Sequence, residues 1–238
     1  MIINKKVPTK KVENKTNNIV TYNSRKIKNQ EAIENCVITV NGQNNKIILN
    51  STKGQGKIYL YLEGTNCTFS IGKNNIINHD LYISFLATST DIPNKIKIEI
   101  GNNNFFNGQN NKIVSPITTN LYIGNGNLFA SDITIWGRND HVIYDIDTGK
   151  QLNDDKPIYI GDNNWICNNV SILPGGKIKN NCVVGYGTLL NKEFSQNNVL
   201  IAGAPPKVRR ENINWSISSD IDRIDKKNNL KIKEKEIW

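Results

Sequence analysis

Histidine is scarce in this chain of 238 residues, which contains only two, His79 and His141. Imidazole titrates near neutral pH and is therefore the side chain best suited to remove the proton of a hydroxyl group in water. His79 lies in an irregular stretch outside any motif, whereas His141 lies in the segment DHVIYD. A lone histidine is more often structural than catalytic, so the assignment depends on its surroundings. We take His141 as the candidate general base.

Two carboxylates close to His141 in sequence are candidates for fixing the tautomer of its imidazole, Asp140 and Asp145. A backbone carbonyl would serve the same purpose equally well. Asp145 has a second reading, because an aspartate in a loop often caps a turn with its carboxylate. The orienting group is left open between these alternatives.

Trp165 is the other residue whose type suggests a place in a site, and it lies 24 residues after His141. A large aromatic side chain at an outward position is costly to leave in water without a purpose. It can form the wall of a ligand site, or it can pack beneath the segment that separates it from His141.

The four cysteines show no metal-ligand or redox spacing, since none of them forms a CxxC pair. With only two histidines in addition, the usual ligands of a metal centre are too few, and we predict no metal. We expect four reduced, mostly buried thiols, as in a cytoplasmic protein. They are Cys36, Cys67, Cys167 and Cys182.

The stretch that must position these residues has a period of six, which belongs to neither an α-helix nor a β-strand. Counting in sixes gives an aliphatic residue at every step: Ile160, Ile166, Ile172, Ile178, Val184 and Leu190. Gly and Asn, which tolerate positive φ, fill the places where a corner is expected. Three hexads with a corner after each close one triangular coil. The pattern therefore predicts an all-β fold, a left-handed parallel β-helix.

The repeat also predicts how the chain is divided. Upstream of residue 138 the six-residue spacing of aliphatic residues appears only in fragments. The coils of this part are therefore expected to be wider or interrupted by loops. The prolines after Ala204 cannot continue a ladder, and the spacing of Ile217, Ile221 and Ile224 suits a short amphipathic helix or tail. The expected segments are a basic arm or cap (1–35), a β-helix (36–203) with irregular coils (36–138), an excursion loop (139–156) and regular coils (157–203), and a C-terminal cap or tail (204–238).

The run from Asp140 to Trp215, with its segments DHVIYDIDTGKQLN, IYIGDNNWIC and IAGAPPKVRRENINW, resembles the hexapeptide-repeat acyltransferases. Within that family it is most similar to the O-acetyltransferases that modify sugars of bacterial capsules and other surface polysaccharides. The likeness covers the C-terminal third to half of the chain. It implies acetyl-CoA as donor, direct transfer without a covalent enzyme intermediate, and a homotrimer with each site between adjacent prisms.

The resemblance gives roles to two residues already singled out. DHVIYD matches the family's D/G-x-H-x-I-x-D pattern, which places the general base on His141. Trp165 matches the Trp of the family's IGDxxWIG segment, which implies that it walls the thioester end of a coenzyme tunnel, with its backbone N–H facing the developing oxyanion. Cys167 departs from the family, which usually has Gly at this point, and a side chain there is expected to narrow the tunnel.

The coenzyme A site is likewise implied by resemblance. Gly185, in VVGYGT, leaves the backbone open to the pantetheine amides, although tight corners alone would also explain a glycine here. Ala202 matches the segment that lines the pantetheine arm. Lys207 matches the family's Lys after the Pro and suits a nucleotide phosphate, with Arg209 or Arg210 as helpers.

The net charge of +9 is concentrated at the two ends of the chain. Basic ends can meet an anionic polysaccharide, the phosphates of coenzyme A or anionic lipid, or can be solvated tails. Nucleic acid is not expected, because no binding motif accompanies the charge. The N-terminus lacks the apolar core of a secretory signal, and the longest apolar run, 81–87, is too short to cross a membrane. We expect a cytoplasmic protein.

Three functions compete on this reading. The first is an acetyl-CoA-dependent O-acetyltransferase acting on a bacterial surface polysaccharide, which the basic ends suggest is anionic, such as one containing sialic acid. The second is an N-acetyltransferase for a nucleotide-linked amino sugar. The third is a non-catalytic β-helix that serves as a binding or scaffold module, which Cys167 and the scarcity of histidine favour. The combination of His141, Trp165 and Lys207 argues against the third.

Overall fold

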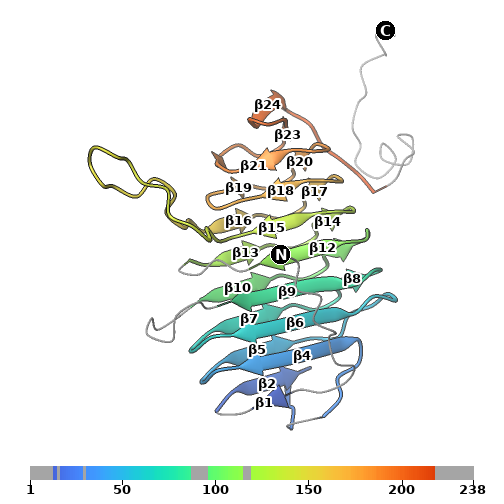
Figure 1. The fold of residues 1–238 in the computed structure, drawn as a ribbon. Coiled ribbons are helices and arrows are strands. Elements are labelled where there is room, and N and C mark those ends of the chain that lie inside the picture. The colour runs from blue at the N-terminus through green and yellow to red at the C-terminus, as the bar shows by residue number, and fades with distance from the viewer. Residues whose placement is uncertain (1–12, 15–16, 29–30, 87–95, 115–118, 218–238) are drawn as a thin grey trace.

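The computed structural model describes residues 13–14, 17–28, 31–86, 96–114 and 119–217, and every regular element in these ranges is a β-strand. The strands form three sheets, here named A, B and C, and these sheets are the three faces of an elongated prism (Figure 1). From strand β7 onward the chain visits sheet B, sheet C and sheet A in turn. Each circuit is one coil, and its strands pair in parallel with those of the next coil.

Sheet A contains, in spatial order, β1 (Glu13–Asn14), β4 (Cys36–Asn41), β6 (Ile58–Glu63), β9 (Leu81–Leu86), β12 (Asn111–Val114), β15 (Thr134–Trp136), β18 (Ser171–Ile172) and β21 (Leu189–Leu190). Sheet B contains β22 (Glu193–Phe194), β19 (Lys177–Ile178), β16 (Ile158–Ile160), β13 (Leu121–Ile123), β10 (Lys97–Ile100), β7 (Thr68–Ile71), β5 (Lys46–Leu49), β2 (Ile19–Tyr22) and β3 (Arg25–Lys26). Sheet C contains β24 (Lys207–Arg210), β23 (Leu200–Ala202), β20 (Val183–Val184), β17 (Trp165–Ile166), β14 (Leu128–Phe129), β11 (Phe105–Phe106) and β8 (Ile76–Ile77).

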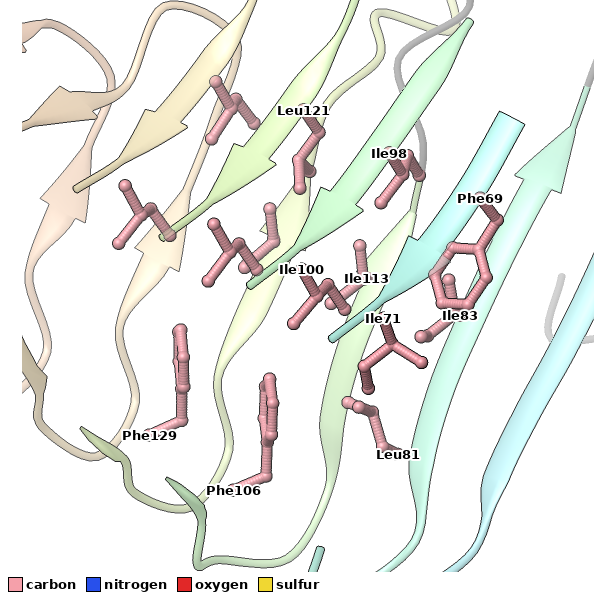
Figure 2. Packing of buried hydrophobic residues seen from close by; sticks show 14 of the residues in the cluster. Phe69, Ile71, Leu81, Ile83, Ile98, Ile100, Phe106, Ile113, Leu121 and Phe129 are labelled. Carbon is pink, nitrogen blue, oxygen red and sulfur yellow. The ribbon is translucent and has the colours of Figure 1, made fainter. Parts of the chain in front are cut away.

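The core is a set of columns in which the same position of successive coils points inward. All six residues of the predicted hexad series have at most 1% of their surface exposed, which confirms the period of six. In the wider coils Phe106 and Phe129 stack with ring centroids 4.6 Å apart and planes 5° from parallel. Figure 2 shows these columns of aliphatic and aromatic side chains inside the prism. Residues of the same type lie above one another in successive coils. Each coil therefore packs its apolar side chains against those of the coils directly before and after it.

Asparagine has two separate roles at the corner that precedes sheet C. One residue per coil adopts positive φ, for example Asn163 (55°) and Asn181 (56°), a conformation that asparagine tolerates better than most residues. The residue that follows points inward and forms a hydrogen-bonded ladder. Its members are Asn75, Asn104, Asn127 and Asn164, each of which accepts through Oδ1 from the backbone N–H of the ladder position in the next coil, the last of these being Cys182.

The coils become narrower toward the C-terminus. Thr68 pairs with Lys97, a step of 29 residues, whereas Ile160 pairs with Ile178, a step of 18 residues, the length of three hexads. Strands β4, β6 and β9 have six residues each, and the strands of the last coils have two or three. The predicted irregularity of the upstream coils is therefore confirmed, and it results from longer strands and corners.

Both ends of the prism contain a strand that reverses direction. β3 pairs antiparallel with β2 at one end of sheet B, and β24 pairs antiparallel with β23 at one end of sheet C. Strands β1 to β3 lie inside the segment 1–35 that the sequence assigned to an arm or cap. The helix predicted near Ile221 and Ile224 lies outside the described residues.

Candidate active site

His141 lies in a loop that projects from the prism between sheet A and sheet B (Figure 1). This His141 loop, residues 137–157, leaves the end of β15 and returns at the start of β16. Its neck is closed by Asn139, whose N–H donates to Asp155 Oδ1 (2.9 Å) and whose Nδ2 donates to the Asn153 carbonyl (2.8 Å). Beyond the neck, the Leu152 N–H donates to the Ile143 carbonyl (2.8 Å). The predicted excursion is thus a hairpin-like loop with a defined base.

The backbone of His141 is fixed while its imidazole is exposed. Asn153 Nδ2 donates to the His141 carbonyl (2.7 Å), and Asn153 Oδ1 accepts from the Ile143 N–H (2.7 Å). His141 lines a small hollow in the neck of the loop together with Asp140 and Asp154. Within the described ranges no side chain bonds to the imidazole, so the ring is open to a hydroxyl group from outside the chain.

Neither carboxylate proposed from the sequence is hydrogen-bonded to that ring. Asp140 forms an ion pair with Arg138 (2.5 Å). Asp145 caps a turn, accepting from the N–H (2.8 Å) and the hydroxyl (2.7 Å) of Thr148. The bonds from the Thr148 hydroxyl and N–H hold the pKa of Asp145 below its ordinary value. The turn-cap reading of Asp145 therefore fits the contacts, and Asp154, which the sequence reasoning missed, is a further carboxylate beside His141.

The outer part of the loop carries an unusual amount of exposed apolar surface. Ile146 is 90% exposed, and the other large apolar side chains of this segment are also exposed. They are Val142, Ile143, Tyr144 and Leu152. An exposed apolar cluster on a projecting loop is the kind of surface that another protein usually covers.

Trp165 lies on sheet C, on a different side of the same chain. Its side chain is 37% exposed, and its ring centroid is 6.2 Å from that of Trp215. Trp215 comes from the segment after the last coil and is anchored by its Nε1–H, which donates to the Asn163 carbonyl (2.6 Å). No separate role for Trp215 is predicted from the sequence, because the contact joins residues 52 positions apart.

The backbone N–H of Trp165 has a partner already. It donates to the Cys182 carbonyl (2.9 Å), and the Cys167 N–H donates to the Val184 carbonyl (3.0 Å). The idea that the Trp165 N–H faces an oxyanion is therefore not supported by its hydrogen bonding. Burial raises the pKa of the Cys167 thiol to about 11, so this thiol is protonated and a poor nucleophile near neutral pH.

Three residues expected at the coenzyme site are brought together where the chain leaves sheet C. Gly185 donates its N–H to the Ile201 carbonyl (2.8 Å), and a Cβ atom added to it would lie 3.1 Å from Ala202 Cβ. Ala202 pairs with Lys207 across the β23–β24 hairpin. These positions form a narrow strip of small residues with an exposed lysine at its end, which suits a slender amide-bearing chain that ends in phosphate.

Comparison with known proteins shows the family to which the chain belongs. No protein-family model matches the chain. It is 30% identical to the polysialic acid O-acetyltransferase of Neisseria meningitidis over 178 residues, 75% of this chain and 78% of that protein. The chain belongs to the hexapeptide-repeat acetyltransferases. It is also similar to the galactoside O-acetyltransferases of Lactococcus lactis (35% over 94 residues) and Escherichia coli (31% over 142 residues), covering 39% and 60% of this chain.

The likeness to the two galactoside O-acetyltransferases is partial, since the chain spans 44% and 63% of their lengths. Among solved structures, the polySia-specific acetyltransferase NeuO matches with a TM-score of 0.71, 24% identity and coverage of 92% of this chain and 93% of that one. The polysialic acid O-acetyltransferase OatWY matches with a TM-score of 0.68, 26% identity and coverage of 90% and 94%. The predicted left-handed parallel β-helix is thereby confirmed.

Proposed function

We propose that this protein is an acetyl-CoA-dependent O-acetyltransferase that acts on a hydroxyl group of a bacterial surface polysaccharide. The observation that carries the proposal is the match to a polysialic acid O-acetyltransferase over three quarters of the chain. His141, with an exposed imidazole on a projecting loop, supports it. The acceptor in those relatives is an anionic sugar polymer, and we extend that acceptor class to this chain.

In the proposed reaction His141 accepts the proton of the sugar hydroxyl as its oxygen attacks the thioester carbonyl. The carbon–sulfur bond of the thioester breaks, the acetyl group stays on the sugar oxygen, and the released thiolate takes up the proton from His141. No residue of the protein is acylated. A protonated Cys167 thiol is consistent with this direct route, because it competes poorly as a nucleophile.

Acetyl-CoA is proposed to lie along the strip formed by Gly185 and Ala202, with Lys207 and Arg209 near its phosphates. Small residues permit close approach of the pantetheine arm. Arg209 is already held there, since its Nε donates to the Ala202 carbonyl (3.2 Å). Trp165 is proposed to wall the thioester end through its ring.

The placement of these groups supports a proposed homotrimer with each site between adjacent subunits. His141 projects from the corner between sheets A and B, while Trp165 and Gly185 belong to sheet C and to the corner that follows it. One chain therefore presents the base and the coenzyme strip on different sides. A neighbouring subunit would bring them together and would also cover the apolar part of the His141 loop.

We place this reaction in the cytoplasm, where acetyl-CoA is available. In the described part of the chain no helix is long and apolar enough to span a membrane.

The proposal is tested by acetyl-CoA-dependent thiol release with a panel of anionic and neutral polysaccharides. His141→Ala should leave a folded protein with at least about a hundredfold lower turnover, since general base catalysis is worth about 10² to 10⁴ in rate. His79→Ala is the matched control, because His79 is also exposed and lies outside the site, and its turnover should equal that of the wild type.

An active His141→Ala variant would remove His141 as the base. Absence of thiol release with every acceptor, together with absence of acetyl-CoA binding, would instead favour the non-catalytic binding module. Release with a nucleotide-linked amino sugar, and with no polysaccharide, would favour N-acetylation.

A further inference from the structure

A second hollow, of about 630 Å³, lies on sheet B at the foot of the His141 loop, and the proposed reaction does not use it. Pro157, the last residue of that loop, forms part of its wall. The residues that matter for its chemistry are two aromatic rings, two lysines and two amides: Tyr122, Tyr159, Lys177, Lys179, Asn120 and Asn180.

The aromatic part is a stack that ends inside the hollow. The rings of Tyr122 and Tyr159 are 4.9 Å apart and 13° from parallel, and the two residues are in register on neighbouring strands. Their separation equals the spacing of strands in a sheet, so the rings stack along the axis of the prism. Tyr122 covers one face of Tyr159. The other face is directed toward the next coil, where Lys177 is in register, and Tyr159 remains 43% exposed.

The polar groups around this ring are hydrogen-bond donors. The Oδ1 atoms of Asn120 and Asn180 already accept from the N–H groups of Lys97 (2.9 Å) and Asp162 (2.8 Å), which leaves their Nδ2 groups as the available atoms. Lys179 is exposed, and no acidic side chain in the described residues pairs with it.

The acidic groups near the hollow are compensated. Glu193 pairs with Lys177 (3.3 Å), and Glu99 pairs with Lys97 (2.9 Å). Asp162 accepts from the N–H (2.6 Å) and the amide (3.1 Å) of Asn125. The groups that remain for a ligand are a flat aromatic face, the two tyrosine hydroxyls, two amide donors and one ammonium group.

We propose that this hollow binds one residue of an oligosaccharide of carboxylate-bearing sugars. The C–H face of the sugar ring lies on the open face of Tyr159, its carboxylate pairs with Lys179, and its hydroxyls accept from Asn120 and Asn180. The inference rests on the proposed function for the identity of the polymer. A chain held at this foot of the loop keeps its neighbouring units close to the segment that carries His141, so the subsite would retain the acceptor between transfers.

A sugar is favoured over a second copy of the chain because this face of sheet B is charged. The outward-pointing residues in line with Tyr159 include Glu99, Lys177 and Glu193. The face as a whole has two exposed ion pairs. An interface core between subunits is usually depleted of such charges.

Binding is measured by calorimetry on the full chain, with a sialic acid tetramer and maltotetraose as probes and no acetyl-CoA present. Tyr159→Ala and Lys179→Gln should each weaken binding of the sialic acid tetramer by about five- to tenfold, the effect of losing one stacking or one charge-assisted contact. Maltotetraose should bind more weakly and should not respond to Lys179→Gln.

Two variants serve as matched controls. Tyr82→Ala removes a tyrosine of equal exposure (43%) that stacks on Tyr59 on sheet A, and Lys46→Gln removes an exposed lysine of β5, away from the hollow on sheet B. Neither should change the affinity. His141→Ala should also bind normally, which separates the subsite from the reaction.

Tetramer binding that survives both Tyr159→Ala and Lys179→Gln, or no binding to the wild type, would overturn the subsite even if transferase activity is present. Loss of coenzyme A affinity in Tyr159→Ala, with sugar affinity unchanged, would overturn it in favour of a nucleotide site. Binding that depends on Tyr159 and Lys179 in a protein without thiol release would support the subsite and contradict the proposed reaction.

Discussion

At the scale of single residues, His141 combines a backbone held by Asn153 with an exposed imidazole, as a proposed general base requires. The scarcity of histidine and the DHVIYD motif made it the candidate general base, and the structure places it on a projecting loop. The same reasoning missed Asp154 and Trp215. Their relevance comes from contacts made through the folded loop and across 52 residues of chain, and no local sequence signal reports such contacts.

The four thiols form a second group of residues with a testable property. Burial raises the pKa of Cys36 to about 12 and that of Cys167 to about 11, and it also raises the pKa of Cys67 and Cys182. In the folded protein the reactive thiolate is therefore scarce at pH 8. We expect native protein to react with iodoacetamide far more slowly than urea-unfolded protein, as measured by mass spectrometry.

The same shifts set a direction for stability against pH. A raised pKa in the folded state means that folding favours the protonated thiol. The contribution of this thiol to the free energy of unfolding is therefore complete below the ordinary thiol pKa of about 9. It is lost as the pH rises from there toward about 12, the pKa of Cys36. Rapid alkylation of Cys167 in folded protein at pH 8 would contradict the buried placement of this side chain.

Among the structural elements, the asparagine ladder links successive coils through the asparagines that point inward. Asn104 donates through Nδ2 to the Gly124 carbonyl (2.9 Å), and its Oδ1 accepts from both the N–H (2.9 Å) and the Nδ2 (3.0 Å) of Asn127. Asn104→Ala removes the acceptor for two buried donors. We expect the free energy of unfolding to fall by about 2–4 kcal/mol, measured by guanidinium denaturation.

The neighbouring residue provides the control for this prediction. Asn103 is exposed and has positive φ (58°), which glycine adopts without strain. Asn103→Gly should therefore change the free energy of unfolding by less than about 0.5 kcal/mol. Equal stability of Asn104→Ala and Asn103→Gly would show that the ladder contributes nothing beyond corner geometry.

The elements that the sequence predicted best are those with the strict period. From Ile160 to Leu190 each coil has three two- or three-residue strands and three corners of equal spacing, so the hexad stays in phase with burial. Upstream, the six-residue strand β9 and the 29-residue coil starting at Thr68 break that phase. Inward and outward side chains still alternate along these upstream strands. The corners between the strands vary in length, however, so a fixed period does not predict where they lie.

At the scale of the whole molecule, the separation of His141 from Trp165 leads to a test of the assembly. The proposed trimer should have a mass of about 80 kDa, three times 26.8 kDa, by light scattering. His141→Ala and Trp165→Ala subunits are then co-expressed in equal amounts, and all the trimers are purified together. A site that takes the base from one subunit and the tryptophan from the next is intact in about a quarter of interfaces.

The mixture should accordingly recover about a quarter of the wild-type turnover, more than either parent variant. Mixing wild-type subunits with His141→Ala subunits serves as the control and should retain about half. A mixed protein no more active than the sum of its parents would mean that both residues act within a single subunit.

The reversed strands at the two ends of the prism have a consequence for how the molecule is kept finite. A stack of parallel coils is in effect a short length of fibre, because each sheet edge offers unpaired backbone groups to a further strand. Strands β3 and β24 occupy one edge of sheet B and one edge of sheet C in the antiparallel sense. A further coil would have to pair in parallel with these edges, but each edge is occupied by an antiparallel strand. The two hairpins therefore oppose end-to-end polymerisation.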